Sequence, residues 1–219
     1  MTELIDVSEK IEKFGDKVNV FLPDIHLPEF KTQKPPKFVF TDKCYNEFKF
    51  FVKNLTKYFL VREYSEIVDR NRCSEELRTI FELTPQGAIK ALLFISQIHP
   101  ETKIPAKFLI DFKKNLLSFF TPIREMKALI ILDFEITVGN LRGYPDIIWV
   151  KNKNIGILEI KVEKGNLSNI SACAGLFREK GFIVNYFGFY YPLGTTGGYI
   201  NAVPNEWNHL ELLNLLSSE

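Results

Sequence analysis

Along the first half of the chain, apolar side chains recur every three or four residues, which is the spacing of amphipathic helices. Thr41 or Asp42 can cap the first such helix. Thr84, followed by Pro85 in the first turn, is a strong start signal for a later one. The expected helices span residues 41–59, 84–99 and 105–120.

After Pro122 the apolar side chains alternate with polar ones, and this pattern predicts β-strands. The polar segment from Lys151 to Asn154 separates two of these strands and predicts a hairpin turn. Ser168 can cap a later helix, which Gly181 would end. The expected strands span residues 132–138, 146–150, 155–161 and 182–191, and a short terminal helix spans residues 210–216.

These elements predict an α/β (α+β) protein in which helices flank a central mixed β-sheet. Prolines punctuate residues 1–40, and we expect them to form an arm around the body, with an edge strand near Lys37–Phe40. The chain of 219 residues suffices for one domain with a substantial appendage. We therefore divide it into an N-terminal arm and largely helical extension at 1–104 and a core at 105–219.

The composition narrows the class of protein without identifying a partner. The formal net charge of +1 excludes a global basic field, so any nucleic-acid surface must be a local patch. Cys44, Cys73 and Cys173 lie far apart and form no metal-binding pair. No apolar run is long enough for a bilayer, and the first residues lack a secretory signature. We expect an intracellular protein, in the cytoplasm or nucleus, with no membrane partner.

Two carboxylates and one ammonium group are expected to meet on the predicted hairpin. Asp146 stands at the head of the first strand, and Glu159 and Lys161 lie two residues apart on the second, so they point to the same side. The hairpin would bring Asp146 close to both. Charges inside apolar strands are costly to bury. A divalent cation would balance the acids, while the lysine could orient a water or stabilise charge on a phosphate.

The short sequence motifs that contain these residues resemble those of a known protein superfamily. Pro145-Asp146 and Glu159-Ile160-Lys161 are similar to the two motifs of the PD-(D/E)XK nuclease superfamily, and their surroundings look most like its RecB-type exonuclease branch. The resemblance implies a restriction-endonuclease-like core and hydrolysis of phosphodiester bonds, of DNA more than RNA, with Mg²⁺ or Mn²⁺. It also implies that Asp146, Glu159 and the Ile160 carbonyl bind the metal and that Lys161 contacts the water or the phosphate.

The resemblance also implies a third carboxylate from the element before Asp146. Glu135 is our candidate, because it shares a strand face with Asp133 and Thr137 and precedes Asp146 at a comparable distance to the acid of RecB-type relatives. Glu125 is the alternative, if the ligand comes instead from the end of the preceding helix. The sequence leaves both choices open.

The helix after the hairpin departs from the RecB-type pattern. Many members carry a glutamine and then a tyrosine there, whereas this chain has Asn169, Ser171 and Cys173. Candidate phosphate contacts in the same half of the chain are basic side chains, namely Arg142, Arg178 and Lys180.

Lys49, Lys53 and Lys57 recur every fourth residue on one face of the first predicted helix. We interpret this face as solvated helix surface, and a ridge that follows a phosphate backbone is the alternative.

Two other functions compete with a nuclease. The neutral net charge and the altered helix also suit a nuclease-like module that no longer cuts and serves nucleic-acid binding or assembly. A purely structural protein, with Glu159 and Lys161 as an exposed surface pair, is a further alternative. The N-terminal region could select substrate, cap the core or form a homodimer or larger assembly.

Overall fold

The computed structural model describes residues 3–14, 18, 44–70, 73–163, 165–194, 198–203 and 207–218. Most of the predicted N-terminal arm, including the edge strand near Lys37–Phe40, lies outside these residues. The described helices are α1 (Val7–Phe14), α3 (Tyr45–Glu63), α4 (Glu75–Phe81), α5 (Pro85–Ile95), α6 (Ala106–Glu125), α7 (Leu167–Glu179) and α8 (His209–Ser217). None of the helices in these ranges is both long and apolar enough to cross a bilayer.

The strands form one large and one small sheet. The main sheet has the order β2-β3-β6-β7-β8-β9, and the small sheet has the order β1-β5-β4. Both contain parallel and antiparallel neighbours, so the protein has the mixed α/β architecture that the sequence predicts. The strands are β1 (Ile5–Asp6), β2 (Val68–Asp69), β3 (Leu129–Leu132), β4 (Ile136–Val138), β5 (Leu141–Gly143), β6 (Ile147–Lys151), β7 (Asn154–Ile160), β8 (Ile183–Tyr190) and β9 (Gly198–Ala202).

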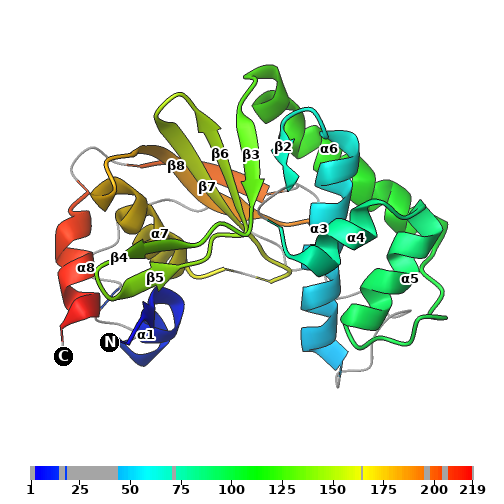
Figure 1. The fold of residues 1–219 in the computed structure, drawn as a ribbon, viewed down its shortest axis with the longest axis horizontal. Coiled ribbons are helices and arrows are strands. Elements are labelled where there is room, and N and C mark those ends of the chain that lie inside the picture. The colour runs from blue at the N-terminus through cyan, green and yellow to red at the C-terminus, as the bar shows by residue number, and fades with distance from the viewer. Residues whose placement is uncertain are drawn as a thin grey trace.

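Helices cover the main sheet on both faces (Figure 1). One hydrophobic cluster joins α3, α4, α5 and α6 to the face of the sheet that carries Trp149, Leu158 and Tyr190. A second cluster joins α1, α7 and α8 to the opposite face, which carries Ile157 and Phe187. The alternation of side chains along each strand separates these two cores, because successive residues point to opposite faces.

The helical predictions hold in the interiors and differ at some ends. Thr84 caps α5 by accepting a hydrogen bond from the Gly87 amide at 3.3 Å, and Pro85 occupies its first turn, as predicted. The predicted caps Thr41 and Asp42 lie outside the described residues, and the described helix α3 begins after Cys44, which provides no side-chain cap. The third expected helix is α6, which continues beyond residue 120 and includes a proline near its end.

Helix α7 begins one residue before the predicted cap Ser168, because Asn166 accepts the Ser168 amide at 2.9 Å and acts as the cap. Gly181 follows the end of this helix with a φ of 83°, the left-handed conformation that glycine adopts most easily. The predicted C-terminal end of the helix is therefore confirmed.

The hairpin between β6 and β7 is confirmed, with Asn152 in the turn at a φ of 60°. The single strand expected at 132–138 is wrong. The chain turns at Asp133, where φ is 51°, so β3 stays in the main sheet and β4 joins the small one. An aspartate tolerates this left-handed conformation better than most side chains. The break separates residue 135 from the main sheet.

Candidate active site at one end of the main sheet

Three strands of the main sheet have their acidic residues at the same end. β3 and β7 finish there, and β6, which is antiparallel to both, begins there. Asp133 follows the end of β3, Asp146 precedes β6, and Glu159 is the second-to-last residue of β7. Ile147 pairs with Leu158, so one step further along this register brings Asp146 opposite Glu159. The hairpin geometry predicted from the sequence therefore brings the two acids together.

Asp146 is held by three separate contacts, although only 6% of its surface is exposed. Its Oδ2 accepts a hydrogen bond from the Ile160 amide at 2.8 Å, and its Oδ1 lies 2.9 Å from Lys53 Nζ. The Asp146 carbonyl accepts the Asp133 amide at 3.1 Å. These contacts fix the carboxylate against the end of β7.

Glu159 is also buried, at 8% exposure, and its Oε2 lies 2.6 Å from Lys161 Nζ. The two side chains are on the same side of β7, as their spacing predicts. Because Glu159 is withdrawn from solvent, the alternative of an exposed surface pair is wrong.

The lysines of α3 lie along these acids rather than in solvent. Lys53 pairs with Asp146, and Lys57, only 6% exposed, pairs with Asp133 at 2.6 Å. Lys49 pairs with Glu163, which lies just beyond β7. The interpretation of this face as solvated helix surface is therefore wrong. The four-residue spacing is visible in the sequence, but the acids that pair with these lysines follow or precede strands that lie 76 to 114 residues further along the chain.

Four acids at this end of the sheet are thus matched by four lysines. The pairs are Lys49–Glu163, Lys53–Asp146, Lys57–Asp133 and Lys161–Glu159, and we call them the lysine–acid ladder. Eight residues of helix separate the first and last lysine of α3, a rise of about 12 Å. Strands in a sheet are about 4.8 Å apart, so α3 has the length to cross the ends of three of them.

Burial would raise the pKa of Asp146, but Lys53, Lys57 and the Ile160 amide outweigh it and hold the pKa below its usual value. Burial would likewise lower the pKa of Lys53, but Asp146, Glu159 and Asp133 raise it above its usual value. The net directions keep both groups charged. They also place three carboxylates within electrostatic reach of one ammonium group.

The two candidates for a third carboxylate lie elsewhere. Glu135 is exposed beyond the break in the strand, where it accepts a hydrogen bond from Thr137 Oγ1 at 3.5 Å. Glu125 is exposed at the end of α6, and the whole of β3 separates it from the ladder. Asp133, which shared a strand face with Glu135 in the sequence, is the acid that contacts the site. Its left-handed backbone turns it toward α3 and could not be read from the alternating pattern.

The three candidate phosphate contacts are not brought together. Arg178 and Lys180 lie at the C-terminal end of α7, whereas the ladder lies beside the loop that leads into its N-terminus. Arg178 also donates to the Val184 carbonyl at 3.2 Å and stacks over Trp207. Arg142, on β5, lies over the ring of Tyr144. Asn169 Oδ1 and Ser171 Oγ on α7 are buried and have no hydrogen-bond partner among the residues that the structure describes.

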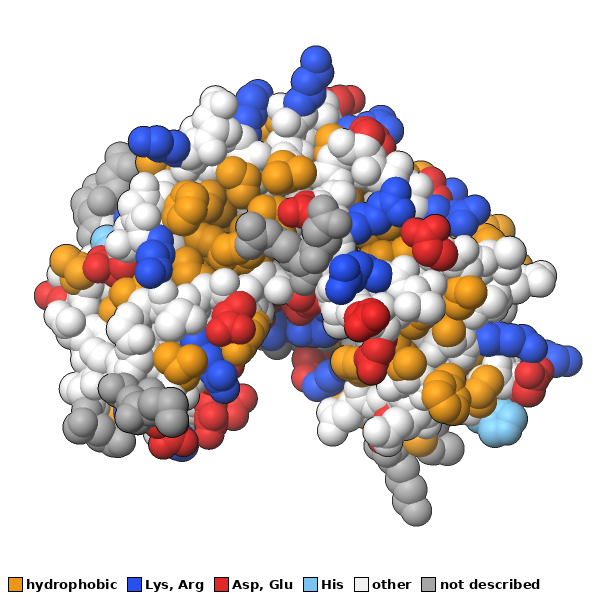
Figure 2. Space-filling model, viewed as in Figure 1, with side chains coloured by type: hydrophobic (Ala, Val, Ile, Leu, Met, Phe, Trp, Pro, Cys, Tyr) orange, Lys and Arg blue, Asp and Glu red, His pale blue; other side chains and the backbone are white. Residues whose placement is uncertain are grey.

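Figure 2 shows a hollow between the side of the molecule that carries α3 and the side that carries α1 and α8. Positive and negative side chains gather along its walls and at its upper end. In Figure 1 the strands β3, β6 and β7 converge toward the top of the same space. The end of the sheet that carries the ladder therefore faces a concave part of the surface.

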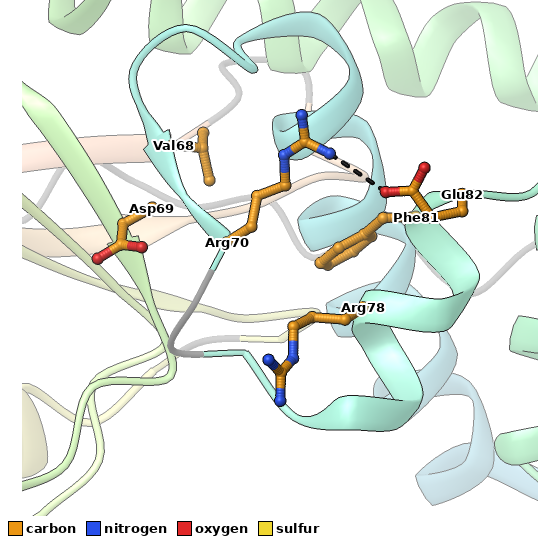
Figure 3. A pocket seen from close by; sticks show the side chains of 6 residues that line it. All are labelled: Val68, Asp69, Arg70, Arg78, Phe81 and Glu82. Atoms are coloured by element: carbon orange, nitrogen blue, oxygen red, sulfur yellow. Dashed lines mark hydrogen bonds and ion pairs between the residues drawn. The ribbon is translucent and has the colours of Figure 1, made fainter.

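A second cavity, of about 400 Å³, borders the same end of the sheet (Figure 3). It lies where β2 ends, next to β3, and Arg70, Arg78 and Phe81 line it together with two acids. Arg70 pairs with Glu82 across the cavity at 3.3 Å. This cavity carries side chains of both charges and lies beside β3. We therefore describe it as a neighbour of the ladder and not as a second candidate active site.

The acids at this end of the sheet do not form a closed metal cage among the described residues. Within the described ranges no three His, Cys, Asp or Glu side chains form a group that could hold a metal ion. Mg²⁺ is commonly bound by one or two carboxylates together with waters and substrate phosphate oxygens. Asp146 and Glu159, both buried, could provide those two carboxylates, and Ile160, whose carbonyl is the further candidate ligand, directly follows Glu159 in the sequence.

Comparison of the sequence with models of known protein families and with curated proteins finds no match. The chemistry of the site therefore carries any statement about function.

Proposed function

We propose that the chain is a metal-dependent nuclease that hydrolyses phosphodiester bonds, with a restriction-endonuclease-like core. The main support is the pair of buried carboxylates, Asp146 and Glu159, on adjacent strand ends with Lys161 in contact with one of them. Burying two acids side by side is unfavourable unless cations compensate them. The resemblance to PD-(D/E)XK nucleases assigns Mg²⁺ or Mn²⁺ to these acids and DNA, more than RNA, as the substrate.

A bound divalent cation would lower the pKa of a water and neutralise negative charge on the phosphate. In this proposal Asp146 and Glu159 hold the cation, with the Ile160 carbonyl as a further oxygen ligand. The Ile160 amide fixes the orientation of Asp146 through its hydrogen bond at 2.8 Å. Lys161, in contact with Glu159, can orient the attacking water or hold a phosphate oxygen. Asp133 replaces Glu135 and Glu125 as our candidate for the third acid.

A specific observation favours a second candidate, a nuclease-like module that no longer cuts. Both oxygens of Asp146 already have partners, Lys53 and the Ile160 amide. Because each acid of the lysine–acid ladder is paired with a lysine, its negative charge is compensated without a metal ion. Such a module would bind nucleic acid or assemble with other subunits through the same fold.

Cleavage assays distinguish the two candidates. The purified chain is incubated with linear and circular DNA, single- and double-stranded, and with RNA, each in Mn²⁺, in Mg²⁺ and in chelator. We expect cleavage that requires the metal and is lost in Asp146→Asn and Glu159→Gln.

The matched controls are Glu101→Gln and Glu135→Gln, which remove exposed carboxylates outside the ladder and should leave cleavage intact. Circular dichroism confirms that each variant is folded. Metal-dependent cleavage that persists in both Asp146→Asn and Glu159→Gln would disprove the assignment of the site, and no cleavage under any condition would favour the inactive module.

A further inference from the structure

Lys53 stands out among the lysines of the ladder because it reaches the most buried acid from a different part of the chain. Its Nζ lies 2.9 Å from Asp146 Oδ1, and 93 residues separate the two in the sequence. The acid is withdrawn from solvent, whereas about a third of the lysine side chain is exposed. The lysine is therefore within reach of solvent, and the carboxylate is not.

The contacts of Asp146 leave little room for another cation. Oδ2 accepts the backbone amide of Ile160, which belongs to the sheet and cannot move away without breaking the strand pairing. Oδ1 contacts only an ammonium group at the end of a flexible four-carbon stem. Of the two partners, the ammonium of Lys53 is the one that can leave.

Lys53 is also surrounded by the acids that a divalent cation would use. Asp146, Glu159 and Asp133 all act on its charge. An ammonium group and a divalent cation at this position would repel each other strongly, since the site is partly shielded from water. The two cations are therefore expected to exclude one another.

Resting on the proposed function, we propose that Lys53 is a positioning residue that occupies the cation site in the metal-free protein and must leave Asp146 when a divalent cation binds. The released ammonium group faces the hollow, where a substrate phosphate would meet it. The ladder would thus keep the buried acids compensated before the metal arrives and set the metal affinity through competition.

The test is the Mn²⁺ affinity of the full chain without substrate, measured by calorimetric titration. Lys53→Met keeps the length of the side chain and removes its charge, so we expect Mn²⁺ to bind about tenfold more tightly, within the range of typical couplings between two bound ligands. Lys49→Met is the matched control on the same helix, because its partner Glu163 is exposed and is not one of the proposed ligands. Its Mn²⁺ affinity should stay that of the unmodified chain.

A second measurement needs no substitution and protects the test against a misfolded variant. Lysines of the unmodified chain are acetylated with and without Mg²⁺, and the extent at each lysine is read by mass spectrometry. Labelling of Lys53 should rise several-fold with Mg²⁺, while that of Lys57, which is buried against Asp133, should not.

The outcomes separate this inference from the proposed function. If Mn²⁺ binds the unmodified chain through Asp146 and Lys53→Met binds it no more tightly, the competition is disproved while the metal site stands. If Lys53→Met binds Mn²⁺ and the unmodified chain does not, the competition is confirmed. Absence of binding in both proteins, or labelling of Lys53 that ignores Mg²⁺, overturns the inference, and the former also contradicts the proposed metal site.

Discussion

The two ends of the main sheet differ in how their polar side chains are paired. At the end that carries the ladder, buried and partly buried acids are compensated by lysines of α3 and by Lys161, which follows β7. At the opposite end, the hairpin turn adjoins a cavity of about 250 Å³ whose lining includes Trp149 and Tyr186 and no acid. Asn185 and Asn154 meet there through an uncharged hydrogen bond at 2.8 Å.

The same strands, β6 and β7, run between both ends, so their pairing does not require buried charge. The far end shows that this sheet can finish without an acid among the described residues that line its cavity. Buried ion pairs are seldom more stabilising than apolar residues of similar size. The comparison therefore favours a chemical role for the charged end, and substitutions at matched positions of the two ends test this role.

The largest difference is expected for lysines at the two ends of β7. Lys161→Ala should lower metal-dependent cleavage by about a thousandfold, or roughly 4 kcal/mol of transition-state stabilisation, because it removes the charge next to the proposed phosphate. Lys153→Ala, in the turn at the other end, should retain full activity. The initial rate of cleavage of labelled DNA measures both, and equal rates would remove the functional distinction between the ends.

The next effect concerns the stability of the ladder. Lys57→Met should reduce the free energy of unfolding by about 2 kcal/mol, because Asp133 loses its partner in a partly buried place. Lys90→Met, which breaks an exposed pair with Glu101, should cost about 0.5 kcal/mol or less. Urea denaturation followed by circular dichroism compares the two, and a similar loss in both would contradict special burial of the ladder.

Acid should weaken the charged end selectively. The pKa of Asp146 is lowered in the folded protein, so its contribution to stability is present above the ordinary value of 3.8 and is lost as pH falls through the lower folded value. Between about pH 5 and pH 2, Asp146→Asn should therefore lose less stability than the unmodified chain. Thermal melts across this range test the slope, and parallel curves would argue against the lowered pKa.

The smallest effect is expected at the far end. Tyr186 is 45% exposed, and its ring stacks on Trp149 with centroids 6.5 Å apart. Tyr186→Ser should cost about 0.5 kcal/mol of stability and leave cleavage unchanged. A strong loss of cleavage in this folded variant would show that the uncharged end also takes part in function.

Local patterns were sufficient for the elements that build the site. The polar turn before Asn154 and the alternation around Glu159 predicted the hairpin, the opposed positions of Asp146 and Glu159, and the placement of Lys161 beside Glu159. These contacts are close in the sequence, and strand geometry fixes them.

The remaining parts of the site depend on distant contacts. Lys53 and Lys57 looked like solvated helix surface, because nothing within α3 reveals that it crosses the sheet end. The sequence pattern favours Glu135 over Asp133 as the third carboxylate, because alternation assumes a continuous strand. The left-handed turn at Asp133 ends that strand. The alternating pattern does not reveal this break, and the partner of Asp133, Lys57, lies 76 residues earlier in the chain.

Crystals grown with Mn²⁺ test the central claim most directly, because the anomalous scattering of manganese locates the ion without assumptions about its ligands. We predict one anomalous peak between the carboxylates of Asp146 and Glu159, with Lys53 turned away from Asp146. A map with no peak there, and with Lys53 still on Asp146 at saturating Mn²⁺, would contradict it.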